Sequence, residues 1–103
     1  MKAFFLDYLQ KAYREHFALP AFAVDNLPML KAIVKAAELC RSPVILMVSE
    51  SSVAYLGMDY IAAISRVAIN RARVPVFLHF DHGQHLTTGK SMVDAGADSV
   101  MID

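Results

Sequence analysis

The stretch Val76-Phe77-Leu78-His79-Phe80-Asp81-His82-Gly83 decides the fold. It opens with a short run, Val76–Phe80, whose apolar character is continuous rather than alternating. Such a run is typical of a strand that is covered on both faces, as in parallel sheets. Three further runs share this character, and we expect each to be a strand: Ala21–Val24, Val44–Val48 and Ser99–Ile102.

Helical patterns fill the segments between these runs. Asn26 is placed to cap the second helix, and Pro28 suits its first turn. Gly96 is placed to end the last helix. The expected helices are Ala3–Glu15, with Phe5, Leu9, Ala12 and Tyr13 on one face, then Met29–Cys40, Met58–Ala72 and Leu86–Ala95.

The order of elements is therefore one helix followed by βαβαβαβ. Strand–helix alternation at this spacing implies an α/β fold with parallel strands and right-handed crossovers. Two architectures fit this pattern. One is a small open doubly wound sheet, and the other is half of a (β/α)8 TIM barrel, which in full needs about 250 residues. Periodicity alone does not choose between them.

The composition excludes two classes of protein. The 103 residues are 56% hydrophobic with a formal net charge of zero. A disordered segment would need low hydrophobicity and high charge. A nucleic-acid binder would need a basic face, whereas ten Lys and Arg are here balanced by ten Asp and Glu. We interpret the excess of apolar residues as a sign that part of the surface is covered by a partner or by a missing remainder of the fold.

The single cysteine, Cys40, allows no disulfide within the chain, which fits a reducing cytoplasm. We expect Cys40 to be a buried helix residue. No stretch approaches the roughly 18 apolar residues of a membrane span. The expected localisation is cytoplasmic, with no nucleic-acid or membrane partner.

Polar residues gather at the ends of three expected strands, where α/β folds place their functional groups. Ser49-Glu50-Ser51-Ser52 follows the second strand, and Asp103 follows the fourth. After the third strand, His79 and Asp81 share strand parity, so both should point to one face, with Phe80 on the other. Gly83 would let the backbone turn sharply. A metal-binding imidazole beside a carboxylate that moves protons would suit catalysis.

Simpler interpretations of these residues stay open. The spacing of His79, His82 and His85 would suit three ligands on one helix, although the strand and Gly83 argue against a helix there. Asp81 would serve as a helix cap, and His82 as an ordinary loop residue. Ser49–Ser52 most often caps the helix that follows. Asp103, as the last residue of the sequence, normally has no role.

Together the motifs resemble those of class II, zinc-dependent fructose- and tagatose-bisphosphate aldolases. The resemblance covers nearly the whole chain, and the Asp-His-Gly motif at residues 81–83 is fairly specific. It implies that residues 1–103 are a single partial domain: a leading helix plus four βα-type units, forming the N-terminal half of an aldolase-type TIM barrel. The segments that carry it, in order, are Leu19–Asn26, Ser42–Glu50, Leu78–Gly83 and Ala95–Asp103.

The resemblance also implies roles for particular residues. Asp81 matches the acid/base that exchanges a proton with the C4 oxygen of a ketose 1,6-bisphosphate, and His82 matches one of three histidine ligands of the catalytic Zn²⁺. Ser49 matches a position that faces the substrate. Asp103 matches an aspartate that lies beside the metal site or binds a second cation. Ala23 stands where the family usually has Asn, and an alanine cannot hydrogen-bond there.

The chain holds only part of such a site. A catalytic zinc needs three protein ligands, and the matching positions here supply only His82. We therefore expect residues 1–103 alone to bind no catalytic zinc and to lack aldolase activity. We also expect self-association or a homo-oligomer through the open sheet edges. The alternatives are a dimerising half-barrel with a structural or small-ligand role, and an unrelated phosphate-binding domain. The phosphate binder would need a Gly-rich loop in place of Asp25–Pro28.

Overall fold

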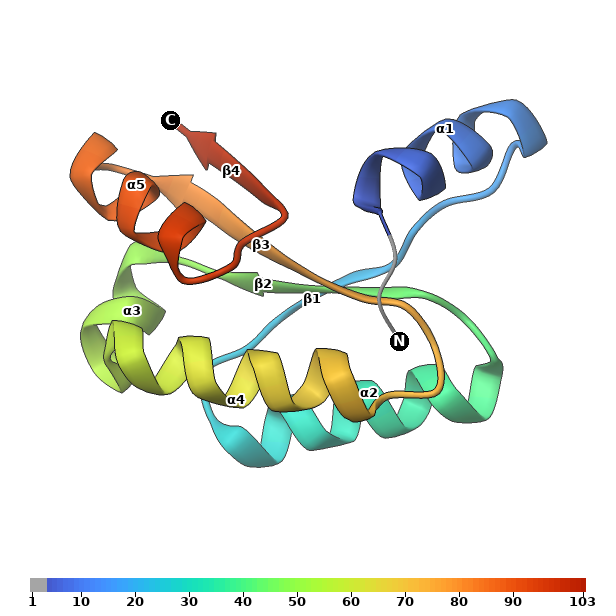
Figure 1. Cartoon of the computed structure of the whole chain (residues 1–103), viewed down its shortest axis with the longest axis horizontal. Helices are drawn as coiled ribbons and strands as arrows, with labels where there is room; N and C mark the ends of the chain where they lie inside the picture. The colour runs from blue at the N-terminus through green and yellow to red at the C-terminus, as the bar shows by residue number, and fades with distance from the viewer. Residues whose placement is uncertain (1–3) are drawn as a thin grey trace.

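The computed structural model describes residues 4–103 (Figure 1). Helices and strands alternate after a leading helix, as expected from the sequence. Their order is α1 (Phe5–Glu15), β1 (Ala21–Ala23), α2 (Leu27–Cys40), β2 (Val44–Val48), α3 (Glu50–Leu56), α4 (Met58–Arg71), β3 (Val76–Gly83), α5 (Leu86–Asp94) and β4 (Ser99–Ile102). Of the expected leading helix, Ala3 lies outside the described residues.

The four strands form one parallel sheet in the order β1-β2-β3-β4. Each strand pairs with the strand that follows it in the chain. The register aligns Ile45 of β2 with Ala21 on one side and with Phe77 on the other. This sequential order has no reversal point, which a doubly wound sheet requires, and it is the order of a TIM barrel.

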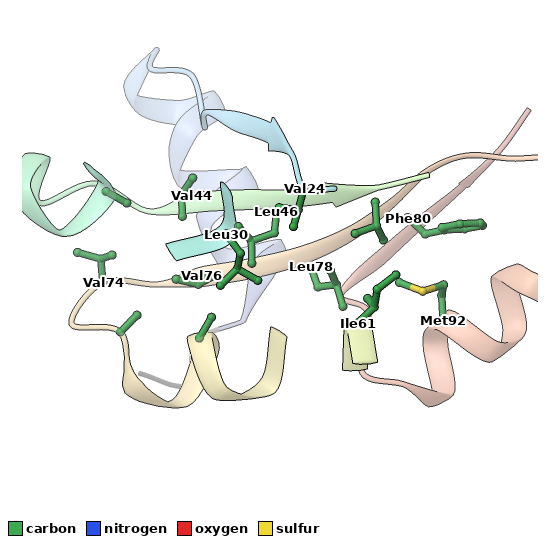
Figure 2. Close-up of a cluster of buried hydrophobic side chains, with 14 residues drawn as sticks. Val24, Leu30, Val44, Leu46, Ile61, Val74, Val76, Leu78, Phe80 and Met92 are labelled. Atoms are coloured by element: carbon green, nitrogen blue, oxygen red, sulfur yellow. The ribbon is translucent and has the colours of Figure 1, made fainter. Parts of the chain in front are cut away.

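The main core lies between the sheet and the helices α2 and α4, which run side by side below the strands in Figure 1. Every second residue of β2 and β3 points into it, and Leu46 and Phe80 are fully buried. Figure 2 shows these side chains meeting Leu30, Ile61 and Met92 from the helices. Burying each large apolar side chain contributes about 1.5–3 kcal/mol, so this layer holds the helices against the sheet.

Helix α1 covers part of the opposite face of the sheet (Figure 1). The rings of Phe5 and Tyr8 lie against Phe77, with centroids 4.9 and 5.6 Å apart. The stripe expected from the sequence was wrong in part, because Leu9 and Tyr13 are exposed. The face that packs is instead Phe5, Tyr8 and Ala12, since residues three and four apart share a helix face.

The helix boundaries follow local chemistry. Asn26 caps α2 as predicted, accepting a hydrogen bond from Met29 N–H at 2.8 Å, although the helix begins at Leu27 rather than Met29. Helix α3 was not expected as a separate element, and Gly57, at φ 94°, divides it from α4. Gly96 follows α5 at φ 105°, which confirms its role in ending that helix.

Two further observations concern the surface. The expectation that Cys40 is buried was wrong: it is the last residue of α2, it is exposed, and Arg41 turns the chain away in a left-handed conformation. Within residues 4–103, no single helix is long and apolar enough to cross a membrane. Helices α3 and α4 pass that test only when taken together, and they meet at an angle of 98°.

Candidate active site

The carboxyl ends of β2, β3 and β4 bring the expected site residues to one edge of the sheet. Val48 pairs with Phe80, so Ser49 and Asp81 follow at the same level of neighbouring strands. Gly83 pairs with Ile102, which places Asp103 beside the end of β3. The backbone N–H of Asp103 donates to Gly83 O at 3.0 Å. Parallel pairing is therefore what gathers these residues.

His79 and Asp81 point to the same side of β3, as their parity predicted, while Phe80 is fully buried on the other side. His79 Nε2 lies 3.4 Å from Asp81 Oδ1, and His79 Nδ1 lies 2.6 Å from Ser99 Oγ. A short chain of polar contacts thus runs from β4 through His79 to Asp81. Only 28% of the Asp81 side chain is exposed, so few orientations are open to its carboxylate.

His82 lies at an irregularity between Phe80 and Gly83, where the register of β3 against β4 shifts. Its backbone is left-handed, at φ 49°, and its side chain is 63% exposed. The imidazole lies between two carboxylates: Nδ1 is 3.1 Å from Asp103 Oδ2, and Nε2 is 3.8 Å from Asp81 Oδ2. The structure therefore brings together three of the four expected site residues.

The role expected of Gly83 as a sharp turn was wrong, since the left-handed residue is His82. Gly83 is the buried last residue of β3, and a Cβ added there would overlap the ring of Phe80. Such an atom would also lie 3.0 Å from Met101 O. The glycine is needed for close approach rather than for backbone conformation.

The hydroxyl of Ser49 is engaged in its own turn. It accepts a hydrogen bond from Ser52 N–H at 3.3 Å, which makes Ser49 the N-cap of α3, and it lies 2.9 Å from Ser51 Oγ. Ser52, which is buried, donates to Asp25 Oδ1 at 2.8 Å. The helix-capping interpretation of this segment is therefore confirmed, and within the described residues these contacts do not join Ser49 to Asp81 or His82.

Glu50 is a residue of this edge that the sequence did not single out. Its Oε1 accepts hydrogen bonds from the N–H groups of Gln84 and His85, each at 3.0 Å, and lies 3.4 Å from His85 Nδ1. Desolvation raises the pKa of the Glu50 carboxyl, but the two N–H groups and the His85 imidazole outweigh it, so the pKa is lowered overall. No pattern in the sequence pairs residues this far apart.

Two simpler interpretations of the third strand end are excluded. His79 and His82 belong to β3 and His85 is the N-cap of α5, so the three histidines do not lie on one helix. Asp81 does not cap α5, because that helix begins five residues later, at Leu86, and has no side-chain cap hydrogen bond.

A catalytic zinc takes three protein ligands from nitrogen, sulfur or oxygen donors. Within residues 4–103, no group of three or more His, Cys, Asp or Glu side chains is arranged to hold a metal ion. The described part of the chain therefore does not by itself fit a zinc ion.

Comparison with known proteins identifies the family. The model of the class-II fructose-bisphosphate aldolase family matches residues 5–103. The chain belongs to this aldolase family.

Two curated aldolases are similar to this aldolase-family chain over 94% of its length. It is 41% identical to 6-phospho-5-dehydro-2-deoxy-D-gluconate aldolase of Bacillus licheniformis and 36% identical to fructose-bisphosphate aldolase of Treponema pallidum. The matches cover 34% and 31% of those proteins. The chain therefore spans about a third of the length of the curated relatives that it matches.

Solved aldolase structures share the fold. The YdjI aldolase of Escherichia coli K12 superposes with a TM-score of 0.92 at 29% identity, over 100% of this aldolase-family chain and 40% of its own. A fructose-1,6-biphosphate aldolase from Coccidioides immitis, described as putative, gives 0.87 at 34% identity, over 96% and 39%. The prediction of half a TIM barrel with parallel strands is confirmed.

Proposed function

We propose that the chain forms part of a zinc-dependent class II aldolase that reversibly cleaves a ketose 1,6-bisphosphate. The products would be dihydroxyacetone phosphate and an aldehyde phosphate, which is a reaction of carbohydrate metabolism such as glycolysis. Membership of the family supports this proposal, and a cytoplasmic setting belongs to it. The ketose is fructose or tagatose 1,6-bisphosphate. The whole activity needs residues outside this chain, since the relatives are about three times as long.

The observation that carries the proposal is the pairing of Asp81 with His79 at the end of β3. The carboxylate lies on the site side of the sheet, held near the imidazole at 3.4 Å. In cleavage, the Asp81 carboxylate takes the proton of the C4 hydroxyl while the C3–C4 bond breaks. C4 becomes the aldehyde carbon, and the electron pair stays on C3 of the dihydroxyacetone phosphate half. In the condensation direction, Asp81 returns the proton to the same oxygen.

The other site residues take supporting roles in this proposal. His82 contributes one ligand to Zn²⁺, with the remaining ligands supplied from outside residues 1–103. Asp103 orients His82 through the 3.1 Å contact or binds a second cation beside it. Ser49, at the end of β2, faces the phosphorylated substrate, which requires its hydroxyl to leave or share the contacts within its turn.

A chimera tests these assignments. Residues 1–103 would replace the matching N-terminal part of the Treponema pallidum aldolase, and cleavage of fructose 1,6-bisphosphate would be followed. We expect activity that Asp81→Asn lowers by about 10²–10⁴-fold, as for loss of a general acid/base. We expect His82→Ala to lower the zinc content measured by atomic spectroscopy. Asp94→Asn, on the exposed side of α5, is the matched control and should change neither. An active chimera that tolerates Asp81→Asn would refute the assignment.

A second candidate is a dimerising half-barrel with a structural or small-ligand role. It is favoured by the outer strands β1 and β4, which have no strand partner on their outer sides among residues 4–103. Aldolase activity and about one zinc per chain in the isolated chain would contradict the need for outside residues. Neither activity nor zinc, together with a stable dimer, would favour this second candidate.

A further inference from the structure

Glu50 joins two loops at the site edge of the sheet. It is the first residue of α3, and the Ser49 cap fixes its backbone there. Its side chain crosses from the end of β2 to the turn that follows β3. There one carboxylate oxygen accepts the N–H groups of Gln84 and His85, both at 3.0 Å. Only 20% of the side chain is exposed, so it is packed between the two loops rather than free in solvent.

The turn that Glu50 holds leads directly into helix α5. Helix α5 begins after His85, and within the described chain its N-terminus has no side-chain cap hydrogen bond. A carboxylate near a helix N-terminus is favoured by the helix dipole as well as by hydrogen bonds. Desolvation raises the pKa of Glu50, but the two backbone N–H groups and the His85 imidazole together lower it overall, which agrees with a carboxylate bound to this turn.

His82 lies two residues before this turn, and its left-handed backbone needs support from neighbouring residues. A non-glycine residue in the left-handed region costs about 1–2 kcal/mol, so the surrounding structure must fix it. From the β4 side, Asp103 N–H donates to Gly83 O at 3.0 Å. From the β2 side, Glu50 holds Gln84 and His85. The two anchors lie on either side of the irregularity that turns the His82 imidazole toward Asp103.

We propose that Glu50 is a positioning residue that acts through the backbone of Gln84 and His85 to fix the direction of the His82 imidazole. An effect of Glu50 on catalysis rests on the proposed function, because the direction of the His82 imidazole affects catalysis only if this edge is an aldolase site. The effect of Glu50 on the direction of the imidazole does not depend on catalysis.

The test is nuclear magnetic resonance on the chain, with each variant at one fixed pH. For Glu50→Ala we expect amide hydrogen exchange at Gln84 and His85 to rise about tenfold or more, as for loss of a hydrogen bond to a charged group. We also expect the ring signals of His82 to move. Glu50→Gln keeps a carbonyl oxygen in place, and should restore most of the protection and the His82 signals. If Glu50→Ala fails to fold, Glu50→Asp takes its place, since it keeps the charge and withdraws the carboxylate by one methylene.

Glu38→Ala is the matched control. Glu38 Oε1 also accepts a backbone N–H across a loop, from Arg73 at 3.3 Å, but at the other end of the sheet. The Glu38→Ala variant should leave the His82 ring signals unchanged. Unmoved His82 signals in Glu50→Ala or Glu50→Asp would overturn the inference, as would an equal shift in Glu38→Ala. None of these readings uses catalysis, so a failed aldolase assay would count against the proposed function alone.

Discussion

Gly83 lies at a point of β3 where there is no room for a side chain. We expect Gly83→Ala to destabilise the chain by about 1–3 kcal/mol, because the new methyl group would overlap the buried Phe80 ring and crowd Met101 O. Urea unfolding followed by circular dichroism would measure the loss.

Two further variants separate this steric effect from backbone strain. In the background of Phe80→Leu, the cost of Gly83→Ala should shrink, since the overlapping ring is gone. Gly96→Ala should also lower the free energy of unfolding, but for a different reason. The added methyl group lies in open space, and the strain comes from the backbone, which has φ 105° at this residue. A Gly83→Ala cost that does not depend on Phe80 would contradict the close-approach explanation.

Asp98 should make the free energy of unfolding depend on pH. Desolvation raises the pKa of its carboxyl above 3.8, although the hydrogen bond from Leu78 N–H at 2.8 Å opposes that rise. A raised pKa in the folded state means that the folded chain binds the proton more tightly than the unfolded chain. The stability that this contributes is therefore full below 3.8 and is lost as the pH rises through the raised pKa.

Comparison with Asp98→Asn isolates that effect, since the amide keeps an acceptor for Leu78 and does not titrate. Free energies of unfolding would be measured at a series of acidic pH values. We expect the wild-type chain to lose stability relative to Asp98→Asn as the pH rises from below 3.8. A difference that stays constant, or that changes in the opposite direction, would show that the carboxyl pKa is not raised.

Some residues of the site were predictable from the sequence and others were not. The shared direction of His79 and Asp81 follows from strand parity alone, and the structure confirms it. The left-handed backbone of His82 was not predictable, because it depends on a register shift of β3 against β4, and β4 is distant in the sequence. The roles of Asp81, His82, Ser49 and Asp103 in catalysis stay predictions. Glu50 was missed because its two hydrogen bonds come from backbone N–H groups, which leave no signature in the sequence.

At the scale of elements, the cap of α2 is the clearest link between sequence and stability. Asn26→Ala removes the acceptor for Met29 N–H and should cost about 1 kcal/mol, whereas Asn26→Asp keeps an acceptor and should cost much less. Thermal and urea unfolding of both variants would measure the difference. Equal losses in the two variants would mean that the side chain packs rather than caps.

The strands and long helices were predictable because each has a strong local pattern. Continuous apolar runs gave the four strands, and the boundary of β1 differs only by Val24. Helix α3 was missed because it has only seven residues, too few for a helical period to stand out. The stripe of α1 was partly misplaced because its packed face is set by the single ring of Phe77, which the helix meets from the far side of the sheet.

At the scale of the whole molecule, the outer strands decide how the chain behaves in solution. We expect the chain of residues 1–103, prepared by itself, to self-associate through β1 and β4. Unpaired strand edges bind other edges, and Phe22 and Ile102 on these strands are exposed. Sedimentation over a range of concentrations would measure the association.

A lysine on the β1 edge should weaken this association. Phe22→Lys places a charge on the outer strand, while Leu39→Lys places one on an exposed apolar residue of α2 away from the edges. We expect the first variant to shift the chain toward monomer and the second to have little effect. A wild-type chain that is monomeric at every concentration would contradict the expectation.

The order β1-β2-β3-β4 has a consequence for synthesis on the ribosome. Each strand pairs with the one made immediately before it, and only one helix, or two between β2 and β3, separates consecutive strands in the chain. No strand needs to wait for a distant later segment before it pairs, and closure of each loop stays short. The sheet can therefore be built outward from its first strand in the order of translation, one strand at a time, with the newest strand always at the growing edge.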